Sequence, residues 1–350
     1  MDVRDDPGAG AGRPGEAGLM RGRGGWRIAG NEDDLEEGLF GQVLLWVFEL
    51  LPWLDAKGIR PHWAIRSRLY GAPPERLVLP GVFEPAYEPP GRVARERSLL
   101  WARVLHTSAL GGDWPGVHAL WTRHFRVPAR IEARADALGL PPGTLGLHYR
   151  GTDKNRQPID TNAVAIEDFL VLAAAFVEEH AGVRAIFVAS DEPGLLARVR
   201  GRFPDLPVHG LGDVAFHKAD AAADGGKADR ALLDCVALSR CRWVLKCSSA
   251  LSGFAKVLNP SLACYRVSAC KLWSDVPYFP DAYVPRLELA DPAARAILAR
   301  QFAQDWLDDP RARARWSTPF VARRRHGPWR TAVNALKYGA SLLLGRPRKA

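Results

Sequence analysis

Three side chains suited to binding a diphosphate fall within seven residues of one another: His148, Arg150 and Lys154. A guanidinium offers paired donors to anionic oxygens, and an ammonium adds a point charge. These residues end a run of strand formers that begins at Thr144, after the turn signal at 141–143. Ligands of open α/β sheets bind at the carboxyl ends of the strands. The pattern predicts either an anion site for a pyrophosphate and its nucleoside, or a strand end whose cations are merely solvated.

The chain after Gly143 alternates between predicted strands and helices, which is typical of a parallel sheet with helices on both faces. Strands are expected at 144–150, 183–189, 206–209, 242–247 and 261–267, and helices at 164–180, 193–202, 228–240, 249–258 and 291–307. Before Gly143 the pattern is less regular. A helix is expected from Val43 to Leu51, a strand at 59–65, and helices at 94–110 and 114–124.

Other residues of this chain are also placed to meet an anion or a base. Ser248 and Ser249 lie between a predicted strand and a helix, where hydroxyls and unpaired N–H groups either bind an anion or cap the helix. Gly41 and Gln42 open the helix at 43–51, as an anion-facing loop or as a simple helix start. Asp234 lies within an apolar helix, which is costly for a carboxylate unless it has a partner.

The segment at 148–154, HYRGTDK, resembles the His-x-Arg-Arg-x-Asp-Lys signature of GDP-fucose-dependent fucosyltransferases. These enzymes have a GT-B fold and include α1,6-fucosyltransferases, nodulation-factor fucosyltransferases and, more distantly, protein O-fucosyltransferases. The segments VASDEP at 188–193, and LLD, LS and CSS between 232 and 249, are similar to the same family in the same order. The resemblance implies an α/β GT-B fold with two Rossmann-like domains facing each other across a cleft.

The resemblance also implies roles for individual residues. Arg150 matches the clamp on the donor diphosphate, and Asp234 matches the aspartate that binds the guanine base, with an internal salt bridge as its alternative. His148 matches the histidine beside the base. Asp191 matches a residue at the second strand end, where it either joins the site or caps the helix at 193–202. Gly41 and Gln42 match a loop that faces the donor phosphates.

This chain departs from the family pattern at two positions that affect catalysis. Gly151 stands where the family has a second arginine, so we expect Lys154 to supply the missing cation. The glutamate proposed as general base in α1,6-fucosyltransferases falls at Pro158, which has no basic group, and Asp160 is the nearest substitute. The expected catalytic residues are Arg150, Lys154 and Asp160.

These matches predict a metal-independent, inverting glycosyltransferase that transfers fucose from GDP-fucose to a glycan or glycolipid acceptor. The chain has no Asp-x-Asp sequence, the usual metal–diphosphate clamp of the other glycosyltransferase class. We therefore expect side chains and the start of a helix to stabilise the negative charge on the departing diphosphate. No cofactor or metal is expected. The alternatives are a transferase for another nucleotide sugar and a non-catalytic nucleotide-sugar or glycan-binding protein, which the loss at Pro158 would fit.

The net charge of +9 comes from one end of the chain. Residues 311–350 contain eleven Arg or Lys and no Asp or Glu, which leaves about −2 for the remainder. A nucleic-acid partner is therefore not expected, because duplex binding needs positive charge across a docking face. Five cysteines without a Cys-x-x-Cys pair indicate reduced, buried thiols in a cytoplasmic protein. No apolar run reaches the length of a membrane span.

The sequence predicts this domain organisation: a disordered segment at 1–30, an acceptor-side Rossmann-like domain at 31–138 and a donor-binding Rossmann-like domain at 139–270. Helices at 271–322 are expected to return to the first domain. The basic tail at 323–350 either packs as a helix or contacts anionic lipid on the inner membrane face.

Overall fold

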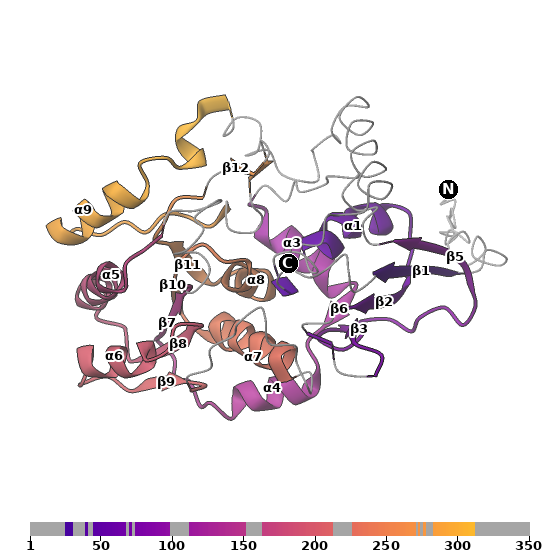
Figure 1. Cartoon of the computed structure of the whole chain (residues 1–350), viewed down its shortest axis with the longest axis horizontal. Coiled ribbons are helices and arrows are strands. Elements are labelled where there is room, and N and C mark those ends of the chain that lie inside the picture. Colours follow the sequence, from indigo (N-terminus) through magenta and orange to yellow (C-terminus); the bar gives the residue numbers. More distant parts are fainter. Residues whose placement is uncertain are drawn as a thin grey trace, which may run out of the picture.

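The computed structural model contains two main sheets, one fully parallel and one mixed, that lie in opposite halves of the long axis (Figure 1). It describes residues 25–30, 39–40, 45–67, 70–71, 74–98, 112–151, 163–212, 226–270, 272–273, 276–277 and 283–311. Both sheets are combined with helices, which confirms the predicted α/β class.

The larger sheet has five strands in the order β11-β10-β7-β8-β9, and every neighbouring pair is parallel. Its strands are β7 (Thr144–Tyr149), β8 (Ala185–Ser190), β9 (Val208–Gly210), β10 (Trp243–Lys246) and β11 (Ala263–Arg266). Each lies within a predicted range or within one residue of it. The signal was strong because strands buried on both faces form short, almost continuous apolar runs.

Helices cover both faces of this sheet (Figure 1). One face packs against α5 (Ile166–Glu179), α6 (Leu195–Arg202) and α9 (Pro292–Gln301), and the other against α7 (Gly226–Arg240) and α8 (Ala250–Leu258). Gly146 of β7 allows α7 to approach closely, because a Cβ there would lie only 2.8 Å from Cδ2 of Leu238. These helices match the predicted ones within two residues, except that α9 ends at Gln301 and a short 3-10 turn, η5 (Trp306–Asp308), follows.

The smaller sheet has the order β3-β2-β1-β5, with β3 antiparallel to β2. Its strands are β1 (Gly25–Gly30), β2 (His62–Arg66), β3 (Leu77–Leu79) and β5 (Val93–Ser98). The expectation of disorder up to residue 30 is therefore wrong for 25–30, since β1 pairs with strands on both sides. The helix expected at 94–110 is also wrong at its start, because 94–98 belong to β5.

Further elements before β7 lie between the strands of the smaller sheet or lead from it to β7. They are α1 (Leu45–Ala56), β4 (Glu84–Pro85), α3 (Trp114–Thr122), β6 (Phe125–Arg126) and α4 (Ala129–Asp136). The α1 and α3 helices confirm the patterns at 43–51 and 114–124; α1 is described from Leu45 and continues to Ala56. After β11, two-residue strands β12 (Leu272–Trp273) and β13 (Val276–Pro277) form a small antiparallel pair.

An aromatic cluster joins α8 to the elements of the smaller sheet. Phe254 of α8 is fully buried, and its ring centroid lies 5.0 Å from Trp121, 5.9 Å from Phe48 and 6.3 Å from Phe83. Aromatic pairs at such spacings add to the free energy gained by burying their area. Through Phe254 the cluster therefore fixes the position of α8, including its first residues.

The C-terminal helix packs differently from the prediction. Arg300 of α9 donates to Asp168 of α5 at 3.3 Å, and the apolar side of α9 belongs to the core that includes α5. Helix α9 therefore packs beside α5 of the larger sheet, whereas it was expected to return to the first domain. Residues 312–322 lie outside the described residues. The tail at 323–350 lies outside the described residues, as do 1–24.

A buried ion pair fastens the segment after α9 to the end of β11. Asp305 accepts from Arg266 at 2.8 and 2.6 Å, from Arg286 at 2.6 Å and from the backbone N–H of Cys270 at 3.1 Å. Arg266 and Asp305 are both almost fully buried. Such a network is costly to break because the remaining charge keeps no partner of opposite sign.

We therefore expect Asp305→Asn to lower the free energy of unfolding by about 3–5 kcal/mol, because it leaves the Arg266 guanidinium uncompensated. Asp308→Asn is the matched control. Asp308 also pairs with Arg286, at 2.8 Å, but its side chain is 58% exposed, so its loss should cost about 1 kcal/mol or less. Chemical denaturation of both variants checks this, and equal losses would contradict the role of burial.

Candidate functional site

The carboxyl edge of the larger sheet gathers polar side chains from neighbouring strands. His148 of β7 lies in register with Lys246 of β10, and Lys246 lies in register with Arg266 of β11. All three side chains are buried. The backbone N–H of Cys247 donates to the carbonyl of His148 at 3.0 Å, so the pairing continues to the end of the strand. Residues 150 and 248 each follow this pair by two positions and therefore leave the sheet on adjacent strands.

Arg150 is oriented by a carboxylate from the next strand. Its Nε lies 3.1 Å from Oδ2 of Asp191, while Oδ1 of Asp191 accepts from the backbone N–H of Gly151 at 3.0 Å. Asp191 thus binds both the guanidinium and the backbone beside it. It does not cap α6, whose N-cap is Gly194 in the left-handed region at φ 77°, so the capping alternative for Asp191 is wrong. The structure brings Asp191 to Arg150, as a site residue requires.

His148 is held by the helix that follows β10. Its Nδ1 lies 2.7 Å from Oγ of Ser252 in α8, and that hydroxyl lies 3.4 Å from the carbonyl of Ser249. Burial, with further contributions from Lys246 and then Arg150, holds the pKa of His148 well below its ordinary value. The imidazole is therefore neutral at physiological pH, with one ring nitrogen able to accept a hydrogen bond.

Ser248 and Ser249 lie where β10 meets α8, as predicted. Both are buried, and Ser249 occupies the N-cap position of α8 with extended backbone angles. Within the described residues, its side chain makes no capping hydrogen bond. The first N–H groups of α8 therefore face the same sheet edge as Arg150, an arrangement that favours an anion.

Asp234 is a buried carboxylate on α7 with incomplete hydrogen bonding. Its Oδ1 has no hydrogen-bond partner among the described residues, and its Oδ2 lies 3.5 Å from Nε of Arg230, one turn earlier. Burial raises the pKa of Asp234 to about 7, although Arg230 opposes this shift. Arg230 turns its other nitrogens to the carbonyls of Leu211 and Gly212. The salt-bridge alternative is thus present, but it leaves one oxygen unsatisfied.

A hydrogen bond links Asp234's helix to the helix that holds His148. The thiol of Cys235, next to Asp234, donates to the carbonyl of Leu251 at 3.3 Å, and Leu251 precedes Ser252 in α8. The five cysteines are buried and form no disulfide, which confirms the prediction of buried thiols. Burial and the neighbouring Asp234 raise the pKa of the Cys235 thiol well above its ordinary value.

Lys246, Ser252 and Glu192 are edge residues that the sequence reasoning did not assign. Lys246 is fully buried beside His148. The sequence could have indicated Lys246, because it ends the apolar strand Trp243-Val244-Leu245 and a lysine is seldom fully buried without a partner. Ser252 was hidden because only the packing of α8 against β7 reveals its partner.

The predicted residues Lys154, Asp160, Gly41 and Gln42 lie outside the described residues, as does Pro158. Their roles therefore stay predictions. The structure brings together His148, Arg150, Asp191, Ser248 and Ser249 at one sheet edge, and it connects Asp234 to them through α8.

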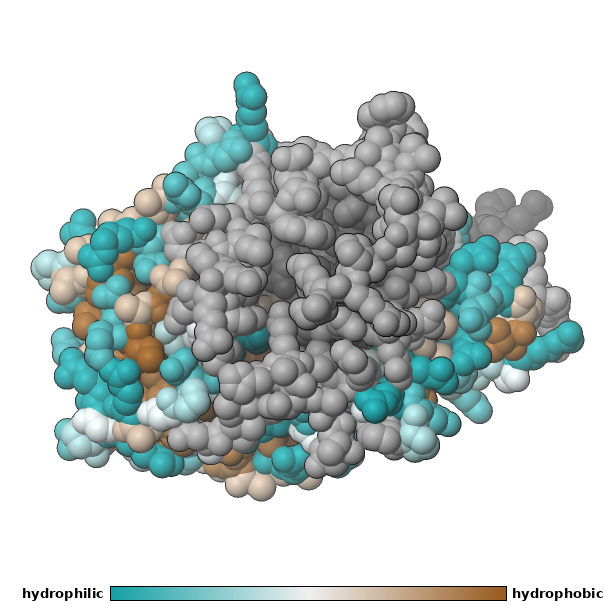
Figure 2. All heavy atoms as spheres, in the orientation of Figure 1, coloured by the Kyte–Doolittle hydropathy of each residue, from teal (hydrophilic) through white to brown (hydrophobic). Residues whose placement is uncertain are grey.

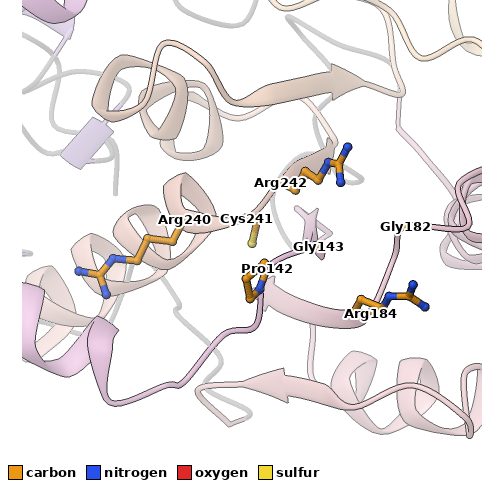
Figure 3. A pocket seen from close by; sticks show the side chains of 7 residues that line it. All are labelled: Pro142, Gly143, Gly182, Arg184, Arg240, Cys241 and Arg242. Carbon is orange, nitrogen blue, oxygen red and sulfur yellow. The ribbon is translucent and has the colours of Figure 1, made fainter.

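A shallow pocket of about 410 Å³ lies at the opposite edge of the same sheet, where β7, β8 and β10 begin. Figure 3 shows that the side chains of its three arginines, Arg184, Arg240 and Arg242, point away from one another. Arg240 is engaged by Glu132 and Asp136, and Arg242 lies 4.4 Å from the ring centroid of Trp243. This hollow therefore lacks the convergent polar groups of a ligand site.

Most of the described surface visible in Figure 2 is hydrophilic, with smaller groups of hydrophobic side chains among it. Among the described residues, no helix has both the length and the apolar character that crossing a bilayer requires. The same residues contain no group of three or more His, Cys, Asp or Glu side chains placed to hold a metal ion.

No protein-family model and no curated protein matches this chain. Solved structures do match it. The fucosyltransferase NodZ from Bradyrhizobium is 19% identical, with 68% of this chain and 95% of that chain covered and a TM-score of 0.45. POFUT1 in complex with GDP-fucose is 11% identical over 69% and 97% of the two chains, with a TM-score of 0.43. A mutant of Arabidopsis thaliana FUT1 in complex with GDP is 10% identical over 78% and 76%, with a TM-score of 0.42.

All three of these proteins are fucosyltransferases.

The environment of His148 yields a prediction of its own. We expect Lys246→Met to raise the pKa of His148, because methionine has a similar size to lysine but carries no positive charge. Titration of the imidazole by NMR measures this. Lys57→Met, which removes an exposed lysine over Trp53, should leave the His148 pKa unchanged. No difference between the two variants would contradict the electrostatic contact.

Proposed function

We propose that this protein is a glycosyltransferase that transfers fucose from GDP-fucose to a glycan acceptor, without a metal ion and with inversion at the anomeric carbon. The observation that carries the proposal is the placement of Arg150. Its guanidinium is fixed by Asp191 at the carboxyl edge of the sheet, on the strand next to the one that delivers Ser248 and Ser249 to the start of α8.

This arrangement suits the charge that forms when a nucleotide sugar reacts. Breaking the bond between the anomeric carbon and the phosphate oxygen leaves the electron pair on the diphosphate. A guanidinium cannot lose its proton near neutral pH and can bind two oxygens at once. Because Asp191 already orients the fork, little reorganisation is needed as charge develops. We assign the diphosphate to Arg150 and to the N–H groups and hydroxyls at the start of α8.

Asp234 and His148 are the groups we assign to the base. Guanine presents N–H donors at N1 and N2, which suit a carboxylate that is acceptor-only when ionised. Asp234 has one buried oxygen without a partner among the described residues, and a buried polar atom in that state is costly until a ligand satisfies it. His148 is neutral and so adds no competing charge beside the base.

The reaction we propose is a direct displacement. An acceptor hydroxyl attacks the anomeric carbon from the face opposite the diphosphate, so a β-linked donor gives an α-linked fucoside. The same edge residues would serve another nucleotide sugar, because they contact the diphosphate and the base more than the sugar. The second candidate is a protein that binds the donor without turning it over. It is favoured by the proline at position 158, which has no carboxylate to act as a base.

Donor turnover tests the proposal. We expect the purified protein to bind GDP, to release GDP from GDP-fucose, and to keep this activity in the presence of a chelator. Arg150→Ala should lower the rate by about 100-fold or more, the loss typical when one donor to a developing oxyanion is removed. GDP release measured by a coupled assay checks both statements.

Arg198→Ala is the matched control for Arg150→Ala. Arg198 is an exposed arginine of α6 that pairs with Glu167 on the far face of the sheet. It should keep the wild-type rate. Equal rates in all three proteins would place the diphosphate elsewhere, whereas GDP binding without any turnover would support the second candidate.

Asp234→Asn tests recognition of the base. At about pH 8, above the raised pKa of about 7, we expect the variant to bind GDP at least tenfold more weakly, because a neutral amide accepts less strongly from N1 and N2. UDP binding, measured in parallel by calorimetry, should change little. Equal losses for GDP and UDP would show that Asp234 does not contact the base.

The same variant has a defined pH dependence. As pH falls through about 7, the raised pKa means that Asp234 takes up a proton in the folded protein, so the wild-type advantage in GDP affinity should shrink toward zero near pH 5. The free energy of unfolding changes with pH in the opposite direction to the GDP affinity. Because the pKa is raised, the folded state binds more protons than the unfolded state, and stability falls as pH rises toward 7. Asp234→Asn should remove that fall.

A further inference from the structure

Gly151 leaves room for a carboxylate at the site edge. A Cβ atom at this position would overlap Oε2 of Glu192 and would lie 2.7 Å from Cε1 of Tyr149. The space beside Gly151 is therefore filled by the side chain of Glu192, which lies against the backbone directly after Arg150. No side chain larger than hydrogen fits at 151 while Glu192 keeps this place.

The two consecutive acidic residues at the end of β8 differ in what holds them. Asp191 is bound by Arg150 and by the N–H of Gly151. Glu192 is half-buried. Its backbone N–H donates to Oγ of Ser190 at 3.0 Å, and its backbone carbonyl accepts from the N–H of Leu195 at 3.4 Å. Within the described part of the chain, its carboxylate accepts no hydrogen bond and forms no ion pair. Asp191 is thus committed to positioning Arg150, while the carboxylate of Glu192 lies beside the backbone of Gly151, the next residue in the chain.

We propose that Glu192 is the general base of the transfer reaction, an inference that rests on the proposed function. The acceptor hydroxyl gives its proton to the Glu192 carboxylate as its oxygen bonds to the anomeric carbon. The bond from that carbon to the phosphate oxygen breaks at the same time, and its electron pair leaves with GDP, held by Arg150. The products are the fucosylated acceptor, GDP and protonated Glu192, which returns the proton to solvent.

The observation behind this assignment is that Oε2 of Glu192 lies beside Gly151, directly after the clamp residue Arg150. A base must lie within hydrogen-bonding reach of the attacking oxygen while the leaving group is held by a separate cation. Glu192 lies against the residue that follows Arg150, so the base and the clamp come from adjacent strands of one rigid sheet edge.

Chemical rescue of Glu192→Ala tests this role. We expect the variant to bind GDP with wild-type affinity but to release GDP from GDP-fucose, with water as acceptor, about 100-fold more slowly. Azide carries no proton to remove, so its attack on the anomeric carbon needs no base. Sodium azide should therefore restore GDP release in Glu192→Ala and give fucosyl azide, detected by mass spectrometry. A purely structural defect would not respond to azide.

Two further variants keep the test decisive. Glu178→Gln removes the same charge from an exposed position of α5 and should keep the wild-type rate. Gly151→Ala should slow GDP release as Glu192→Ala does, because its methyl group displaces the carboxylate, and azide should restore this variant too. A full rate in Glu192→Ala, or a slow rate that azide leaves unchanged, overturns the assignment.

The proposed function and this inference fail in distinguishable ways. A wild-type protein that neither binds GDP nor consumes GDP-fucose contradicts the proposed function and, with it, the base. A wild-type protein that turns over GDP-fucose, together with an unaffected Glu192→Ala, contradicts the assignment of Glu192 alone.

Discussion

The parallel pairing of β7 with β10 is the constraint on which the candidate site depends. It sets His148 beside Lys246, about 100 residues apart in the chain, and directs Arg150 and Ser248 out of the same sheet edge. A shift of one residue would turn each side chain to the other face of the sheet. The register is fixed because both faces of β7 are buried, with Gly146 closed in by Leu238 and Val244 on one side and Leu147 packed on the other.

Helix α8 connects the site edge of the larger sheet to the core of the smaller sheet. Its first residues face the site edge, Ser252 binds His148, and Phe254 two residues later lies in the aromatic cluster with Trp121. One helix therefore sets the position of the anion-facing N–H groups and contributes to the core of the smaller sheet. A change in how α8 packs on Trp121 would move the binding groups together, since they share a rigid element.

Charge at the edge is organised by burial. Burial, with further contributions from Lys246 and Arg150, lowers the pKa of His148 and keeps it neutral, and burial raises the pKa of Asp234 to about 7. Arg266 is neutralised by Asp305, which belongs to the segment after α9. The cations at this edge therefore differ in role. Lys246 lowers the pKa of His148, Arg266 pairs with Asp305, and Arg150 is the one we assign to the diphosphate.

The sequence by itself determined the larger sheet, its flanking helices and the candidates Arg150, His148, Asp234, Ser248 and Ser249, because apolar periodicity and strand-end polarity are local signals. It missed β1 and β5, whose residues are mixed in character and form strands only because β1 pairs with both β2 and β5. Only the tertiary structure decided that Asp191 binds Arg150, that Ser252 holds His148 and that Glu192 fills the space at Gly151. These are contacts between segments distant in the chain, and no local pattern encodes which side chains the packing will bring together.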